Sequence, residues 1–243
     1  MTTWPSGNKT TTANVDSSRD SISATRTDIE KMINNQNDII DIFNIPATPT
    51  DNYMLIWNAS TSKFDVEPSM LGKHDIWIPA QAMYPTADGG CSPITTVELT
   101  EGAPELRVLD FSNSTTQYAQ FSIAMPKSWN EGTITFTAYW TGASVALTGG
   151  VSWGLQAVGV SDDDAIDSTF GSAVVIDDEY IQNDDLHITS ESSALTVGGT
   201  PQAGDLTFFQ LYRDTADSND TYAAAVRLVG VKIHYTIDVG NDD

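Results

Sequence analysis

Apolar and polar residues alternate along many short segments in the last two thirds of the chain. Residues 133–137 read Thr-Ile-Thr-Phe-Thr, and residues 231–235 read Val-Lys-Ile-His-Tyr. Such alternation is typical of strands with one face in a core and the other toward water. Turn-forming residues separate the segments, and the absence of a fixed repeat argues against a solenoid or propeller. Residues 74–243 are therefore predicted to form a mainly β domain, an antiparallel jelly-roll-like β-sandwich.

Residues 19–45 show the spacing of a helix instead. One stripe of a heptad pattern contains Ile22, Ile29, Met32, Ile33, Gln36, Ile39, Ile40 and Phe43. Isoleucine at the seam favours three helices over two. Because a helix this short is not stable alone, the pattern predicts a homotrimeric coiled coil in which Gln36 forms a polar layer. The alternative is a single amphipathic helix packed against its own domain.

Two further segments flank this helix. Residues 1–18 are polar and aperiodic, with a single Trp4-Pro5 pair, and we expect them to be an arm that anchors on a partner surface. Residues 46–73 contain a linker followed by two strand-like segments, 53–58 and 63–68, which predict a hairpin with Trp57 and Phe64 paired across it. An isolated hairpin is marginally stable, so it needs neighbouring copies or a domain to pack against.

The charge of the chain excludes one class of partner. The net charge is −22, and residues 74–243 carry 24 acidic and 5 basic residues. Phosphate backbones would be repelled, so no nucleic acid is expected as a partner. Acidic runs at 162–164, 177–179 and 184–185 lack the spacing of an EF-hand loop, which favours a role in solubility and leaves calcium binding open. No apolar run approaches about 18 residues, so membrane insertion is not expected.

Catalytic motifs are not found in the sequence. It contains no G-x-S-x-G elbow, P-loop or H-E-x-x-H segment. His74, His187 and His234 are scattered singly, and only His187 lies near acidic residues. We therefore expect no catalytic residue, metal site or cofactor. The single cysteine, Cys91, cannot form an intrachain disulfide, and is either a small loop residue or a reactive thiol.

Aromatic residues in turns are candidates for contact with sugars, because carbohydrate sites use exposed rings that stack on sugar faces. Trp129 lies in the turn-like segment PKSWNEG, and Tyr84 precedes Pro85. Both residues have the alternative of closing the end of a core. Trp77, Trp140 and Trp153 lie in strand patterns and are expected in the core or at a subunit interface.

Four segments resemble proteins of one kind. The hairpin segment LIWNASTSKFDVEP resembles the short hairpin modules of bacteriophage tail and head fibres. The segment HDIWIPAQAMYPTADGG, together with residues 118–140 and 151–167, is similar to the C-terminal domain of predicted structural proteins of marine phages. The resemblance covers most of residues 19–238 and implies a fibre or spike subunit located in a virion. It carries no binding residues.

These expectations combine into one main hypothesis and two alternatives. The main hypothesis is a non-enzymatic homotrimeric fibre or spike, attached to a capsid or tail protein through residues 1–18. The first alternative is an adhesin that binds a host-surface glycan through Trp129 and Tyr84. The second is an enzyme that degrades host polysaccharide with paired carboxylates, although the β-helix on which such enzymes usually stand is not indicated.

Overall fold

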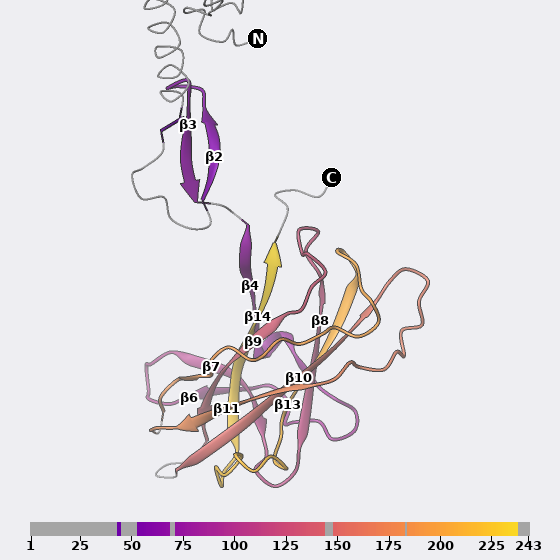
Figure 1. The fold of residues 1–243 in the computed structure, drawn as a ribbon. Coiled ribbons are helices and arrows are strands. Elements are labelled where there is room, and N and C mark those ends of the chain that lie inside the picture. Colours follow the sequence, from indigo (N-terminus) through magenta and orange to yellow (C-terminus); the bar gives the residue numbers. More distant parts are fainter. Residues whose placement is uncertain (1–42, 45–52, 69–70, 144–147, 183, 238–243) are drawn as a thin grey trace, which may run out of the picture. The chain divides into compact units, whose positions relative to one another are not determined.

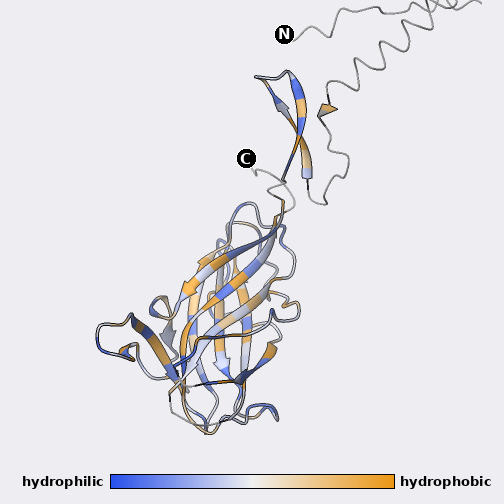
Figure 2. Ribbon diagram, turned by 90° about the vertical axis from the view of Figure 1, so that its left-hand side faces the viewer, coloured by the Kyte–Doolittle hydropathy of each residue, from blue (hydrophilic) through white to orange (hydrophobic). Residues whose placement is uncertain are grey.

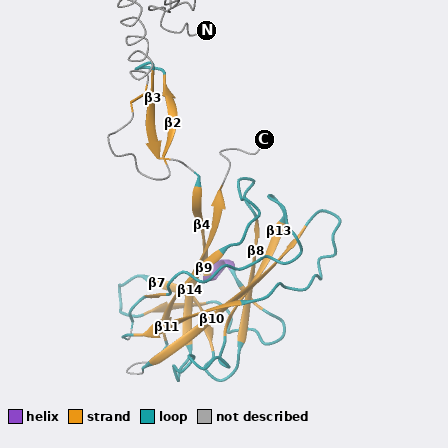
Figure 3. Cartoon of the chain, in the orientation of Figure 1, coloured by secondary structure: helices purple, strands orange, loops and turns teal. Residues whose placement is uncertain are grey.

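A computed structural model describes residues 43–44, 53–68, 71–143, 148–182 and 184–237 of the chain. The chain divides into two compact units, residues 1–70 and residues 71–243. Strands dominate the described residues of both units, and the described helical structure is one 3-10 turn, η2 (Ala80–Ala82) (Figures 1 and 3). Among the residues described, no helix is long and apolar enough to cross a membrane.

The described part of the first unit is a small sheet of three strands. Strands β2 (Tyr53–Asn58) and β3 (Lys63–Pro68) form the predicted antiparallel hairpin, and β1 (Phe43–Asn44) pairs with β3 in parallel. The side chain of Asn58 closes the turn by accepting a 3.0 Å hydrogen bond from the Ser60 amide. Trp57 and Phe64 are paired as predicted, with ring centroids 5.2 Å apart.

Phe43 corrects the end of the predicted helix. It lies in β1 rather than in a helical seam, and its ring stacks on Phe64 with centroids 5.4 Å apart. Pairing with β3 satisfies the backbone of Phe43, and the stacking covers its ring, so these contacts prevail over the local helical pattern. The other seam positions and the anchoring residues lie outside the described residues: Ile22, Ile29, Met32, Ile33, Gln36, Ile39, Ile40, Trp4 and Pro5.

The second unit is a β-sandwich, which confirms the predicted mainly β class. One sheet has five strands in the order β11-β10-β13-β8-β5, and the other has the order β12-β9-β14-β7-β6 with β4 added beside β14. Figure 1 shows the two layers stacked, with β10, β11 and β13 in one and β7, β9 and β14 in the other. The strands are β4 (Gly72–Pro79), β5 (Tyr84–Pro85), β6 (Thr95–Glu98), β7 (Glu105–Phe111), β8 (Gln117–Ala124), β9 (Thr135–Gly142), β10 (Gly149–Val160), β11 (Val174–Tyr180), β12 (His187–Ile188), β13 (Leu206–Arg213) and β14 (Val226–Ile237).

Alternation along these strands builds the core, and Figure 2 shows it as changing colour along the ribbons. Phe121 of β8 and Phe209 of β13 stack within one sheet at 4.9 Å between ring centroids. Phe111 of β7 meets Trp153 of β10 across the interior, edge to face at 5.2 Å. Burial of such large rings supplies much of the stabilisation of a sandwich.

An ion pair lies in the core. The fully buried guanidinium of Arg213 donates hydrogen bonds to Asp220 at 2.8 and 2.9 Å, and to the carbonyl oxygens of Tyr222 and Ala224. Because each charge is matched and hydrogen-bonded, the pair is tolerated in the interior. It fixes the end of β13 to the segment that precedes β14.

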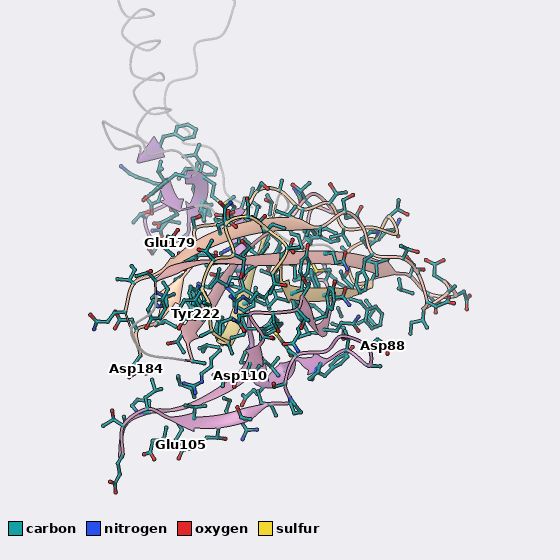
Figure 4. All side chains as sticks on the ribbon, turned by 90° about the horizontal axis from the view of Figure 1, so that it is seen from below. Asp88, Glu105, Asp110, Glu179, Asp184 and Tyr222 are labelled. Carbon is teal, nitrogen blue, oxygen red and sulfur yellow. The ribbon has the colours of Figure 1, made fainter. Side chains whose placement is uncertain are left out.

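Figure 4 labels several acidic side chains of this unit. Four acidic side chains, Asp88, Glu105, Glu179 and Asp184, lie around its rim and are exposed, whereas Tyr222 lies within it. Acidic residues also lie on the outer face of the five-stranded sheet, where Asp177 and Glu179 of β11 are opposite Ser152 and Gly150 of β10. The strands β8 and β13 of this sheet have no acidic residue.

Candidate functional site

One row of side chains crosses the outer face of the five-stranded sheet. Tyr84 of β5 lies opposite Gln120 of β8, Gln120 opposite Gln210 of β13, and Gln210 opposite Gln156 of β10. Residues that lie opposite one another project to the same face of a sheet. The positions next to them along the strands are buried in the core: Ala119, Phe121, Phe209, Leu211, Leu155 and Ala157. The row of Tyr84, Gln120, Gln210 and Gln156, which we call the amide row, therefore faces away from the core.

The amide row is held in place by the sheet and by one of its own hydrogen bonds. The Gln156 amide nitrogen donates to the Gln210 side-chain oxygen at 2.5 Å. The three glutamines are half-buried, and Tyr84 is 47 % exposed at the end of the row. A primary amide has two donors and an acceptor with two lone pairs, so the Gln156–Gln210 bond leaves further capacity on both side chains.

Aromatic rings border the amide row on both sides. Phe208 of β13 lies on one side; Tyr118 and Tyr212 lie on the other, directly opposite each other with ring centroids 5.4 Å apart. All three rings are half-buried. They therefore frame the amides with apolar surface that remains partly accessible to solvent.

Tyr212 lies flat on the sheet over Gly154 of β10. A Cβ atom on Gly154 would lie 2.1 Å from the ring carbon Cζ and 2.5 and 2.6 Å from its two neighbours. The two distances to the flanking carbons are nearly equal and only slightly longer than the distance to Cζ. A point with these three distances lies above the face of the ring and not in its plane. One face of the Tyr212 ring thus covers the backbone at Gly154, and the opposite face is turned away from the sheet.

The face around the amide row carries no charge. Its outward positions on β8, on β13 and on the Gly154–Val160 part of β10 are Tyr118, Gln120, Ser122, Ala124, Leu206, Phe208, Gln210, Tyr212, Gly154, Gln156, Val158 and Val160. Burial raises the pKa of the Tyr212 phenol, and the nearby Asp214 and Tyr118 raise it further. The Tyr212 hydroxyl is therefore neutral and able to donate a hydrogen bond at physiological pH.

The two aromatic residues singled out from the sequence as sugar contacts differ in their surroundings. Tyr84 belongs to the amide row, but Trp129 does not. Trp129 is 3 % exposed and is part of the core, and its backbone forms a bridge with Ile237. It closes the core as the alternative interpretation stated, and its edge lines a pocket of about 430 Å³ together with Glu131 and Gln202. Its buried ring offers no face on which a sugar could stack.

The three tryptophans expected in the core or at a subunit interface do not share one environment. Trp140 and Trp153 are fully buried as expected, but Trp77 is 43 % exposed on the outer face of the other sheet. Its ring meets Tyr139 edge to face at 4.9 Å, beside an ion pair between Lys232 and Asp75 at 2.9 Å. This second aromatic surface is thus embedded in charged side chains, in contrast to the amide row.

The described residues offer little to catalysis or to metals. They contain no group of three or more His, Cys, Asp or Glu side chains arranged to hold a metal ion. His187 is buried and packs between the rings of Trp140 and Tyr180, at 4.5 and 5.3 Å between centroids. The outward positions around the amide row include no carboxylate, imidazole or thiol that could act as a nucleophile or as an acid or base.

Neither the glutamines of the amide row nor the bordering rings of Tyr118, Tyr212 and Phe208 were predicted from the sequence. A signal for the glutamines was present, since each of the three strands has a glutamine directly between two apolar residues: Ala-Gln-Phe in β8, Leu-Gln-Ala in β10 and Phe-Gln-Leu in β13. What connects them is the register of the strands, which alternation does not specify.

No protein-family model and no curated protein matches the chain. Several solved structures are similar in fold. A family 35 carbohydrate-binding module from Clostridium thermocellum has a TM-score of 0.38 and 7 % identity, covering 66 % of this chain and 97 % of that one. The xylan-binding CBM22-2 domain of Paenibacillus barcinonensis Xyn10C has a TM-score of 0.37 and 8 % identity, covering 64 % and 92 %. A family 11 carbohydrate-binding module from Clostridium thermocellum has a TM-score of 0.34 and 9 % identity, covering 68 % and 96 %. At TM-scores this low the likenesses carry no functional argument.

Proposed function

We propose that the outer face of the five-stranded sheet binds carbohydrate. The observation that carries the proposal is the amide row: three glutamines in register across adjacent strands, bordered by aromatic rings and free of charge. A sugar ring has hydroxyl groups that donate and accept hydrogen bonds and C–H faces that pack on aromatic rings. Amides serve both hydrogen-bonding roles. Because the strands are rigid, the side chains need little ordering when a ligand binds.

Binding without cleavage is the function that this face supports. Glycoside hydrolysis generally needs two carboxyl groups that flank the scissile bond. None of the outward positions around the amide row is acidic. The glycan-binding alternative is therefore favoured over the polysaccharide-degrading one, with Tyr84 retained as a contact and Trp129 replaced by Tyr118, Tyr212 and Phe208.

Calorimetric titration of the full chain with oligosaccharides identified on a glycan array tests the proposal. Tyr84→Ala and Gln210→Ala should each weaken binding by about tenfold, equivalent to about 1.4 kcal/mol, because each removes a contact from the face. Trp77→Ala is the matched control, since it removes an exposed ring from the opposite sheet and should leave affinity unchanged. The proposal would be overturned if Trp77→Ala lost binding while Tyr84→Ala and Gln210→Ala kept it. It would also be overturned if the wild type bound no glycan.

A second candidate function is assembly, and the hairpin unit favours it. Phe64 lies opposite both Phe43 and Trp57, and Val66 lies opposite Leu55. Together with Tyr53, these residues form one face of the three-stranded sheet that has no polar member. The exposed fractions of Tyr53, Leu55 and Trp57 are 44, 48 and 41 %. A contiguous apolar face of this kind marks an interaction site more often than a solvated surface.

We infer that this apolar hairpin face packs against the same face in two further copies of the chain, which gives a homotrimer. The heptad pattern of residues 19–45, with isoleucine at its seam, supports three copies. The sandwich would then be displayed by a trimeric fibre or spike in a virion, held to a capsid or tail protein by residues 1–18. In that assembly the carbohydrate-binding face would meet host-surface glycans, so the two candidate functions are compatible.

Native mass spectrometry of the full chain tests the assembly. The wild type should have the mass of a trimer, and Leu55→Asp should be monomeric because it places charges in the apolar hairpin face. Glu67→Gln, on the opposite face of the same hairpin, is the control and should remain trimeric. A wild type that is monomeric at micromolar concentration would contradict the homotrimer. A cryo-electron reconstruction of the particle would then show whether the spike is rooted in a head or a tail.

A further inference from the structure

The charged residues around the amide row indicate which class of carbohydrate the row binds. We infer that the face selects extended chains of neutral sugars and discriminates against chains that carry carboxylate or sulfate groups. This inference rests on the proposed carbohydrate binding and adds the ligand class to it.

No basic side chain is placed on this face to bind an acidic sugar. Residues 71–243 contain six basic side chains. Lys73 and Lys232 are paired with Glu191 and Asp75 beside the opposite sheet, and Arg213 is buried against Asp220. Of the remaining three, Arg227 on β14 near Asp110 and Arg107 on β7 belong to the opposite sheet, and Lys127 lies in the connection between β8 and β9, outside the strands of the face. An anionic group that leaves water without a cation or several donors is costly to bind.

Acidic side chains border the face at one end of its strands. Asp177 of β11 lies opposite Ser152, two residues from Gly154 and on the same side of the sheet. Asp214 directly follows β13, and its charge contributes to the raised pKa of Tyr212. These carboxylates repel an anionic chain and leave a neutral chain unaffected.

The length of the amide row exceeds that of a single sugar ring. The amide row crosses four adjacent strands, so its ends are separated by three inter-strand spacings, or roughly 14 Å. Tyr84 at one end is exposed, and the rings of Tyr118, Tyr212 and Phe208 run beside the glutamines. A single sugar ring can cover only part of such a row. We therefore expect affinity to rise with the number of sugar units until the row is filled, and then to level off.

Titration of the full chain with two matched series distinguishes these possibilities: neutral hexose oligomers from the monosaccharide to the hexasaccharide, and the corresponding uronic acid oligomers. At about 0.01 M ionic strength, where the Debye length is about 30 Å, the neutral series should bind at least tenfold more tightly. At about 1 M the difference should shrink, because the carboxylates are screened. At low salt, Asp177→Asn should reduce the difference in affinity between the neutral and the uronic acid oligomers. Its affinity for the neutral oligomers should be that of the wild type.

The outcomes separate the inference from the function on which it rests. If neither series binds, and no other glycan does, the carbohydrate proposal itself fails. If the uronic acid oligomers bind as tightly as the neutral ones, or if the monosaccharide binds as tightly as the hexasaccharide, the ligand class is wrong and carbohydrate binding stands. Neutral preference, growth with chain length and sensitivity to Asp177→Asn together would support the inference.

Discussion

The ring of Tyr212 lies flat against the backbone of Gly154 on the neighbouring strand, in a space that a β-carbon would occupy. Glycine in the middle of a strand costs about 0.5–1 kcal/mol relative to alanine, so its presence in the central strand β10 needs a reason. The reason is close approach, since only glycine lets the ring lie on the sheet with its other face outward. Gly154 therefore belongs to the proposed site although it has no side chain.

Gly154→Ala should weaken carbohydrate binding without removing any group that contacts the ligand. The new methyl group would displace the Tyr212 ring from the sheet, and such overpacking typically costs about 1–3 kcal/mol of stability. Tyr212→Phe, which keeps the ring in place, should retain more of the affinity than Gly154→Ala. Calorimetric titration measures the binding, and urea unfolding measures the stability. Wild-type affinity in Gly154→Ala would show that the flat ring has no part in the site.

The main features of the fold were predicted from short local patterns in the sequence. Alternation predicted the sandwich, and two strand-like segments joined by a turn predicted the hairpin. The amide row was not predicted, because it depends on the pairing of β8 with β13, whose residues are about ninety positions apart along the chain. Alternation tells which residues share a face of one strand, whereas the register between distant strands is set by the packing of the whole domain.

Two tryptophans show the same limit of local sequence patterns. Trp129 lies in a turn-like segment but is buried, and its backbone pairs with Ile237 at the end of β14. Trp77 lies in a strand but is exposed, because it occupies an outward position of β4, which pairs with β14. Residue type and local pattern do not reveal which neighbour covers a side chain.

The buried Arg213–Asp220 pair should be the most sensitive charged interaction in the sandwich. Asp220→Asn would leave the guanidinium of Arg213 buried without a counter-charge, which costs about 3–5 kcal/mol. Glu191→Gln is the matched control, because its pair with Lys73 is exposed, and such pairs contribute about 0–1 kcal/mol. Urea unfolding followed by tryptophan fluorescence measures both variants. Equal destabilisation of the two would contradict the role assigned to the buried pair.

Cys91 should be inert in the folded protein. It is 5 % exposed, and burial raises the pKa of its thiol to about 12. Since the thiolate is the reactive form, iodoacetamide at pH 8 should not label the native chain and should label it fully after unfolding in urea. Mass spectrometry counts the adducts. Rapid labelling of the native chain would instead identify the reactive thiol that the sequence left open.

His234 should make the sandwich less stable at mildly acidic pH. Burial lowers the pKa of its imidazole, and Lys73 and Lys232 add to this, while Glu191 and Asp75 oppose it. The Nε2 atom lies 3.0 Å from the hydroxyl oxygen of Thr137.

Because the folded-state pKa of His234 is below the value of 6.5 in an unfolded chain, the unfolded state takes up the proton first. Stability is therefore complete above pH 6.5 and decreases as the pH falls through that value.

The carboxyls of Glu191 and Asp75 have pKa values lowered by hydrogen bonds from Lys73 and Lys232, so their own titration lies below pH 4.5. Between pH 7.5 and pH 5 the free energy of unfolding should fall less in His234→Gln than in the wild type, because glutamine cannot be protonated. Urea unfolding at the two pH values measures the difference. An identical decrease in both proteins would assign the acid sensitivity to groups other than His234.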